Sequence, residues 1–269
     1  MVNRINAITL KTIKPIKEYI YNYNLPLMGF NSSTKILKGF KKQDYTTGIL
    51  YLQPADLVAR NTLCAYSDVA GCKEPCLRSS GRLGMSNAQK AMTRRTVQYL
   101  KDPDGFKERL RAEILRNETD NYCIRLNGTS DVVWTDLIAS LPNIQFYDYT
   151  KVLHRVIRNT LSNYHLTFSA SLNSVKTIQQ LKTATDLGLN IAISFNTKEC
   201  KGEFKIPDSI QLFGRTVELA DFDATDLRFL DQDGTVGKLT RKGSTKLERL
   251  KNQGGLNFFA DPNNLQMVA

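Results

Sequence analysis

Long apolar runs are missing from this 269-residue sequence. No stretch approaches the roughly 18–20 consecutive apolar residues that a membrane helix needs. The basic opening, MVNRINAITLKTIKPIKEY, lacks the apolar core and small-residue cleavage site of a secretory signal, and it is not Arg- and Ser-rich like a transit peptide. We therefore expect neither membrane binding nor secretion. Hydrophobic residues still make up 41% of the chain, enough for a sizeable core.

Histidine is scarce, and several catalytic motifs are absent. Only His154 and His165 occur, in a predicted helix and a predicted strand, where a single histidine is more often structural than catalytic. The sequence contains no G-x-x-x-x-G-K-[ST], G-x-G-x-x-G, H-E-x-x-H or G-x-S-x-G pattern. These absences argue against Ser/His/Asp chemistry.

The cysteine count is odd, which argues against a disulfide framework when no secretion signal is seen. In a reducing compartment, clustered cysteines more often bind a metal or take part in chemistry. The five cysteines are Cys64, Cys72, Cys76, Cys123 and Cys200.

Negative charge is outweighed by positive charge. The chain has 37 Lys and Arg against 26 Asp and Glu, a formal net charge of +11. This balance favours anionic partners such as nucleic acid, nucleotides or phosphorylated substrates. The basic N-terminus and the Lys238–Lys251 stretch are the segments expected to contact phosphates. The residues expected to do so are Arg94, Arg95, Lys238, Arg241 and Lys242.

Strand and helix patterns alternate along the chain. Strands are predicted to begin near residues 122, 144, 164 and 189, and this spacing of roughly 20–25 residues is the length of a βα unit. An earlier strand is predicted within 47–59 and a later one at 217–223. The pattern predicts an α/β fold, either a partial (β/α) barrel or an open parallel sheet of about five or six strands with helices outside.

One α/β domain is predicted over residues 46–236, between a basic lead-in segment (1–45) and a basic C-terminal tail (237–269). Two helices precede the alternation. Ser86 and Gln89 fit a capping box at the start of the first helix, and Asp102 followed by Pro103 fits the start of the second.

An irregular loop carries three cysteines, Cys64, Cys72 and Cys76, in a C-x7-C-x3-C array. Thiolates are soft ligands that suit zinc or an iron–sulfur cluster, and three of them leave one metal position open. Cys123 or Cys200 could instead complete a closed zinc site. The alternative is a loop of buried, reduced cysteines that bind no metal.

The segment R-L-N-G-T-S-D follows the strand predicted near residue 122. Arg125 and Asn127 share one face of the strand, Gly128 permits a tight exit, and Ser130 and Asp131 follow in the loop. Such a polar set at the carboxyl end of a parallel strand suits a polar ligand. The alternative is a buried Arg125–Asp131 ion pair with a helix cap.

Other strand ends carry similar polar residues. In F-Y-D-Y-T-K, Asp148 is the best candidate for a buried polar group, and Lys151 could contact a phosphate or carboxylate. Together with Asp131 these two are the candidate catalytic residues. The alternative is that Tyr147 and Tyr149 pack under helices and Lys151 is solvated. The remaining candidates for cofactor binding are Ser169, Ser171 and Asn196.

Three carboxylates lie close together in D-F-D-A-T-D, at Asp221, Asp223 and Asp226. They could bind a hard cation, but the segment lacks the spacing and the glycine of a calcium loop. We expect them to cap a turn.

These motifs, in their order, resemble the bacteriophage gene product 88 family over about residues 45–245. The cysteine array is followed by a K-A-x-x-R-R-T helix, then R-L-N-G-T-S-D, F-Y-D-Y-T-K and D-x-T-D-L-R-F-L-D. The resemblance implies a phage or mobile-element origin, hence the host cytoplasm, and it supplies no catalytic residue. A looser resemblance is to radical S-adenosylmethionine enzymes, which usually show C-x3-C-x2-C; it implies that Cys64, Cys72 and Cys76 hold a [4Fe–4S] cluster that binds S-adenosylmethionine.

Three interpretations follow. The first is an iron–sulfur, radical-type enzyme that acts on a nucleotide or nucleic acid. The second is a non-enzymatic nucleic-acid-binding protein with no cofactor. The third is a zinc-stabilised protein that binds a host protein. The first predicts that one cavity is lined by Cys64, Cys72, Cys76, Asn127, Asp131 and Asp148.

Overall fold

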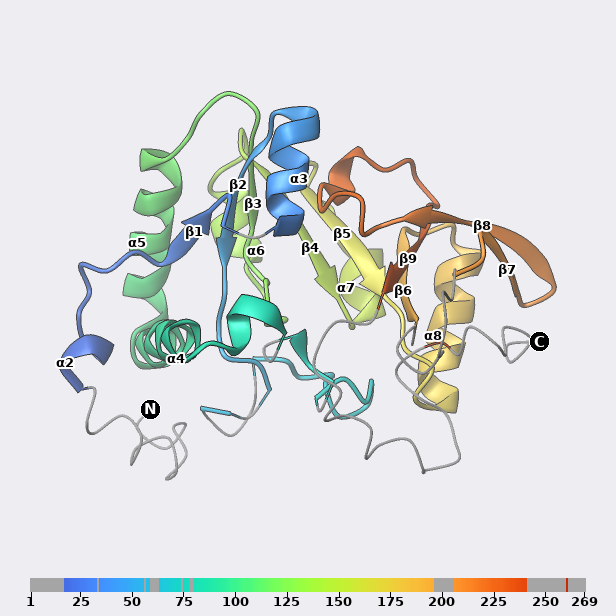
Figure 1. The fold of residues 1–269 in the computed structure, drawn as a ribbon, viewed down its shortest axis with the longest axis horizontal. Coiled ribbons are helices and arrows are strands. Elements are labelled where there is room, and N and C mark those ends of the chain that lie inside the picture. Colours follow the sequence, from blue (N-terminus) through green and yellow to red (C-terminus); the bar gives the residue numbers. More distant parts are fainter. Residues whose placement is uncertain are drawn as a thin grey trace. The chain divides into compact units, whose positions relative to one another are not determined.

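The fold is α/β and is organised around one β-sheet. The computed structural model describes residues 17–32, 34–55, 57–58, 63–73, 75–77, 80–195, 206–240 and 260. Within these residues, the nine strands of the sheet are mostly parallel and follow the order β1-β2-β3-β4-β5-β6-β9-β8-β7 (Figure 1). The predicted α/β fold and the open sheet, rather than a partial barrel, are therefore confirmed, but the sheet is not all parallel, contrary to the prediction, since the β1–β2 and β7–β8 pairs are antiparallel. The chain divides into two compact units: Met1–Ala65, Cys76–Asp148 and Leu161–Tyr164 form the first, and Tyr66–Pro75, Tyr149–Thr160 and His165–Ala269 the second.

The first unit begins its sheet with an antiparallel pair, β1 and β2, and continues with parallel pairings of β2 with β3 and β3 with β4. The strands are β1 (Met28–Phe30), β2 (Thr46–Leu50), β3 (Tyr122–Arg125) and β4 (Gln145–Thr150). The helices are α2 (Lys17–Ile20), α3 (Thr34–Gln43), α4 (Ser86–Lys101), α5 (Pro103–Arg116) and α6 (Thr135–Ala139).

Aromatic packing dominates the core of the first unit. Trp134 is 1% exposed, and its ring centroid lies 5.2 Å from that of Tyr99 and 6.4 Å from that of Phe106. Phe106 recurs with Leu110 and Ile114 at helical spacing on α5, and all three are fully buried. The sequence pattern of this helix and its start at Asp102, whose carboxylate accepts the amide of Gly105, are as predicted.

The second unit pairs β5 with β6, β6 with β9 and β9 with β8 in parallel, and ends in an antiparallel β7–β8 hairpin. The strands are β5 (Tyr164–Ser169), β6 (Ile191–Phe195), β7 (Ser209–Leu212), β8 (Arg215–Asp221) and β9 (Val236–Thr240). The helices are α7 (Leu153–Ile157) and α8 (Val175–Asp186).

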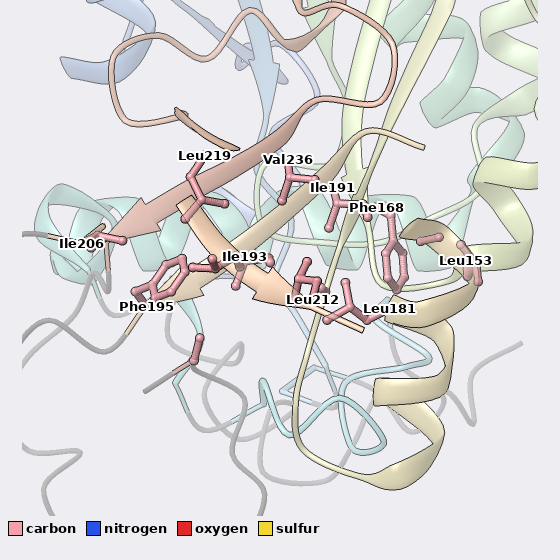
Figure 2. Packing of buried hydrophobic residues seen from close by; sticks show 14 residues of the cluster. Leu153, Phe168, Leu181, Ile191, Ile193, Phe195, Ile206, Leu212, Leu219 and Val236 are labelled. Carbon is pink, nitrogen blue, oxygen red and sulfur yellow. The ribbon is translucent and has the colours of Figure 1, made fainter. Parts of the chain in front are cut away.

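A cluster of aliphatic and aromatic side chains fills the core of the second unit (Figure 2). Alternate residues of β6 belong to it, as period-two patterning requires, and β5 contributes Phe168. Helix α8 contributes Leu181, and Leu153 enters from α7. The labelled residues of the strands and their loops are Phe168, Ile191, Ile193, Phe195, Ile206, Leu212, Leu219 and Val236.

The predicted number of strands was too low. β1 and β7 have only three and four residues, which is too short to show a period. β9 reads VGKLT, and its glycine and lysine led to its assignment to a basic tail. The predicted N-cap at Ser86 was also wrong by one residue, since Met85 precedes the first helical residue. No helix within the described ranges is long and apolar enough to span a membrane.

Candidate functional site

Asp148 and Asn127 form the centre of a buried polar network in the first unit. The Asp148 carboxylate accepts the Asn127 backbone amide at 2.8 Å and the Asn127 side-chain amide at 3.2 Å. It also accepts the hydroxyl of Tyr164 at 3.1 Å. Asp148 is 1% exposed and Asn127 3% exposed. A carboxylate buried this deeply is tolerated because several donors surround it.

The side-chain carbonyl of Asn127 organises the loop that leaves β3. It accepts the Ser130 hydroxyl at 3.0 Å, the backbone amide of Val132 at 2.9 Å and the indole N–H of Trp134 at 3.3 Å. Its amide also donates to the Val132 carbonyl. Asn127, Ser130 and Asp148 therefore hold the shape of the 127–132 loop, which makes them positioning residues.

Close backbone contact at the start of this loop explains why residue 128 is a glycine. Its amide donates to the Leu50 carbonyl at 3.0 Å, and a Cβ at this position would lie 2.6 Å from the ring of Tyr51 and 2.8 Å from that carbonyl oxygen. The next residue, Thr129, donates its hydroxyl to the Leu52 carbonyl at 2.6 Å. The carboxyl ends of the adjacent strands β2 and β3 are thus fastened to each other.

The first end of the cysteine loop is attached to this same strand-end loop. The Cys64 thiol lies 3.6 Å from the carbonyl oxygen of Thr129 and donates to it. One residue earlier, the Leu63 carbonyl accepts the backbone amide of Asp131 at 2.7 Å. Asp131 is half-buried. Arg125, the last residue of β3, is half-buried too.

In the second unit, another part of the cysteine loop is attached to the segment that follows β5. The Ser171 hydroxyl donates to the Ala70 carbonyl at 2.7 Å, and the Asn173 side chain donates to the Val69 carbonyl at 3.2 Å. At Gly71, with φ +64°, a Cβ would lie 2.4 Å from the side-chain oxygen of Asn173, so the Asn173 side chain would have to move to admit one. A left-handed glycine thus permits the close approach that the loop needs.

Lys151 and Ser169 meet beside this attachment, at the carboxyl ends of β4 and β5. The Lys151 ammonium donates to the Ser169 carbonyl at 3.1 Å and to its hydroxyl at 2.5 Å. Both side chains are half-buried. A partly desolvated ammonium at a strand end suits an anionic ligand group, as the sequence predicts for Lys151. Asn196 lies outside the described residues.

The cysteine thiols of the loop suit a soft metal by their chemistry. The Cys72 thiol lies 3.8 Å from the Ser67 carbonyl and, like Cys64, acts as a hydrogen-bond donor. Cys64 and Cys76 belong to the first unit, and Cys72 to the second. Over the described ranges, no three His, Cys, Asp or Glu side chains converge as metal ligands would. Cys123 is buried on β3 beside Thr47, at 3.2 Å.

Arg94 and Arg95, predicted to contact phosphates, are directed into the protein. The Arg94 guanidinium donates to the carbonyls of Leu25 at 3.0 Å and Pro26 at 2.5 Å, and the residue is 2% exposed. Arg95 donates to the Tyr51 carbonyl, and burial lowers its pKa to about 10. Both side chains fix neighbouring segments of the chain in this arrangement.

Lys238 is also engaged by its own unit. Its ammonium forms an ion pair with Asp208 at 2.8 Å and donates to the Pro207 carbonyl at 3.1 Å. These contacts fasten β9 to the segment before β7. Arg241 and Lys242 lie outside the described residues.

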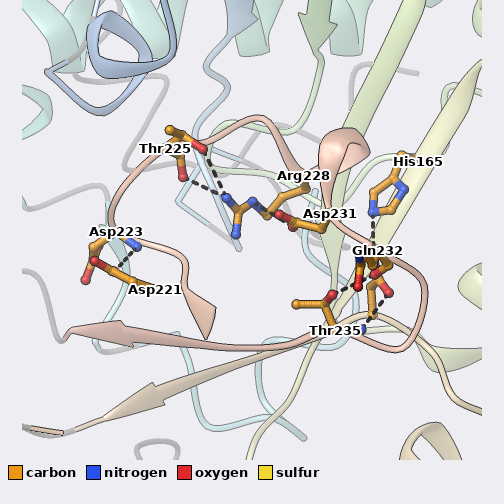
Figure 3. Close-up of polar contacts among 9 residues, drawn as sticks. His165, Asp221, Asp223, Thr225, Arg228, Asp231, Gln232 and Thr235 are labelled. Atoms are coloured by element: carbon orange, nitrogen blue, oxygen red, sulfur yellow. Dashed lines mark hydrogen bonds and ion pairs between the residues drawn. The ribbon is translucent and has the colours of Figure 1, made fainter. Parts of the chain in front are cut away.

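Two carboxylates of the acidic segment after β8 have different roles. Asp221 accepts the amide of Asp223 and so caps a turn, as predicted (Figure 3). Asp223 instead accepts the amide and hydroxyl of Thr240, at the end of β9, at 2.8 and 2.7 Å. Nearby, Arg228 donates to the Thr225 carbonyl at 3.0 Å and lies 3.3 Å from the carboxylate of Asp231.

A family comparison extends over this whole arrangement. The family model for gene product 88 matches residues 27–255. The chain belongs to the gene product 88 family. The matched region includes the cysteine loop and all nine strands, so the gene product 88 family resemblance of the motifs is confirmed. Neither curated proteins nor solved structures gave a match, and no relation to radical S-adenosylmethionine enzymes is shown.

Sequence reasoning missed several residues that shape the site. Trp134 and Tyr164 complete the Asn127–Asp148 network, and Asn173 holds the cysteine loop. Trp134 could have been noticed, because it is the only tryptophan and a buried indole N–H needs an acceptor. No local pattern marks Tyr164 or Asn173.

Proposed function

We propose that this gene product 88 family member is an enzyme whose cysteine loop binds an iron–sulfur cluster and whose substrate is a nucleotide or nucleic acid. Cysteine thiolates of this loop would supply the soft ligands, and the cluster would supply electron-transfer chemistry. The net charge of +11 supports an anionic substrate.

One observation supports the proposal most: in each unit, a part of the cysteine loop is attached to a segment that leaves the carboxyl end of a parallel strand. The attachment is made by Cys64 and Leu63 in the first unit and by Ala70 and Val69 in the second. The carboxyl ends of parallel strands are where α/β proteins bind their ligands. A loop with no role at these ends would not need long-range fastening to them.

The proposal gives the strand-end residues distinct roles. Lys151 would bind an anionic group of the ligand, because its ammonium is already held at a strand end by Ser169. Asp148 and Asn127 would act indirectly, by fixing the loop against which Cys64 lies. Cys64 and Cys72, whose thiols donate to the Thr129 and Ser67 carbonyls, would each have to lose a proton to act as thiolate ligands.

Serine variants of the loop cysteines test the proposal. The proteins would be purified without oxygen and reconstituted with iron and sulfide, and their iron, zinc and acid-labile sulfide contents measured. We expect Cys64→Ser, Cys72→Ser and Cys76→Ser each to lower the cluster content severely. Matched controls are Cys123→Ala, on β3, and Cys200→Ser, at a position outside the described residues; neither belongs to the cysteine array in the sequence, and both variants should retain the cluster.

The pattern across the variants decides between the alternatives. Equal losses in loop variants and controls would show that the iron is adventitious. Zinc at one per chain in the parent, lost in the loop variants, would support the zinc-stabilised alternative instead. Circular dichroism of each variant separates loss of metal from loss of folding.

A further inference from the structure

Helix α3 presents an exposed basic and apolar face in the first unit. Its sequence is TKILKGFKKQ, and its buried side is formed by Ile36, at 2% exposed, and Gly39. Leu37 and Phe40 are each 39% exposed. The side chains of Lys38, Lys41 and Lys42 are exposed as well.

The helical spacing places these groups beside one another. Residues three or four positions apart are neighbours on a helix surface, so Phe40 and Lys41 lie next to Leu37 on α3. Lys41 and Lys42 in turn follow Lys38 by three and four positions. The result is an apolar edge, Leu37 and Phe40, that borders a stripe of three lysines. No acidic residue occurs within α3.

We propose that this face of α3 docks single-stranded nucleic acid. The lysine stripe would contact successive phosphates, and the Phe40 ring would stack on one unpaired base. Aromatic rings that border a basic surface are the usual means by which proteins hold single strands without reading their sequence. This surface does not include the cysteine loop, and the binding of nucleic acid to it does not require a metal centre.

A lipid surface fits the face less well. A helix that lies in a membrane interface needs a broad apolar face that sinks about 5–10 Å into the lipid. The apolar side chain of Ile36 is buried in its own unit. Only two apolar side chains of α3, Leu37 and Phe40, are partly exposed. A duplex also fits less well, because its bases are stacked on each other and leave no π-face for Phe40.

The lysines also stabilise α3 itself, and the test must distinguish this effect from nucleic-acid binding. Lys41 and Lys42 lie in the last turn of α3, where positive charge also stabilises the helix. Neutral glutamine and charge-preserving arginine are therefore better substitutions than glutamate. The free energy of unfolding of every variant would be measured beside its affinity.

Fluorescence anisotropy with a labelled oligothymidylate and a matched hairpin duplex, over a series of salt concentrations, tests the proposal. Lys41→Gln/Lys42→Gln should weaken single-strand binding and reduce the slope of log Kd against log salt by about 1.4, the value for two phosphate contacts. Phe40→Ala should weaken it by about tenfold and leave the slope unchanged. Lys41→Arg/Lys42→Arg should bind like the parent.

The matched control is Arg111→Gln/Arg116→Gln on α5, which removes two exposed charges from the same unit. It should leave the affinity within about twofold of the parent. The proposal is overturned if the control pair weakens binding as much as the α3 pair, or if the parent binds no oligothymidylate at low salt. Tighter binding to vesicles containing anionic lipid than to the oligonucleotide, lost in Phe40→Ala, would also overturn it and indicate a membrane surface.

Discussion

The hydroxyl of Ser171 donates a hydrogen bond of 2.7 Å to the carbonyl oxygen of Ala70, a residue 101 positions earlier in the chain. The same hydroxyl accepts the backbone amide of Asn173, whose side chain reaches Val69. One small polar segment after β5 thus holds the backbone that leads to Cys72. These long-range hydrogen bonds hold this part of the cysteine loop in a defined position within the second unit.

Removing the Ser171 hydroxyl should loosen this part of the loop with little effect on global stability. Ser171→Ala is expected to lower the free energy of unfolding by about 1 kcal/mol, the net value of one hydrogen bond. The rate at which a thiol reagent modifies Cys72 should rise several-fold. Peptide mapping by mass spectrometry would measure that rate, with buried Cys123 as the internal standard. Ser140→Ala, which removes only a local bond to Leu137, should leave it unchanged.

Asp148 should be far more important for stability than an exposed aspartate. In Asp148→Asn, an amide group would face the Asn127 and Tyr164 donors, and at least one buried donor would lose its acceptor. We expect a loss of roughly 3 kcal/mol in urea unfolding. Asp136→Asn is the matched control, since the Asp136 side chain is 91% exposed and its ion pair with Lys107 contributes little. Equal effects of the two substitutions would contradict the network described here.

Any side chain at position 128 should lower the free energy of unfolding. A methyl group there would meet the Leu50 carbonyl, which is backbone and cannot move aside easily. Gly128→Ala is expected to cost about 1–3 kcal/mol of unfolding free energy. In a Tyr51→Ala background the ring contact is gone, and the added cost of Gly128→Ala should shrink without vanishing. Calorimetry of the four proteins would measure this; an unchanged added cost would rule out crowding by Tyr51.

Acid should weaken the second unit through His165. Burial lowers the pKa of His165, partly opposed by Asp233 and reinforced by Arg228. The unfolded state, with an ordinary histidine pKa near 6.5, therefore binds a proton that the folded state resists, and stability falls as the pH drops below about 6.5. His165→Gln should flatten this dependence in urea unfolding. His154→Gln, at an exposed position on α7, should leave it unaltered.

Much of the architecture follows from local patterns. The alternation from residue 121 onwards, the helix start at Asp102–Pro103 and the glycine at 188, with φ +61°, are all visible in sequence because they depend on neighbouring residues. The short strands β1 and β7 are not, because their residues become strands only by pairing with distant partners.

The candidate site was less accessible to sequence reasoning. Charge alone suggested that Arg94 and Arg95 face a ligand, but their carbonyl partners at Leu25, Pro26 and Tyr51 come from segments at least 40 residues away. Asp148 was correctly expected to be buried, whereas its donor Tyr164 could not be foreseen. Hydrogen-bond partners across a fold are set by topology, which no local pattern encodes.

Metal analysis of the parent protein purified and reconstituted without oxygen tests the central proposal most directly. The account predicts a brown protein with about four iron and four sulfide per chain, held through the loop of Cys64, Cys72 and Cys76. A colourless protein that contains no iron after reconstitution, although correctly folded, would contradict it.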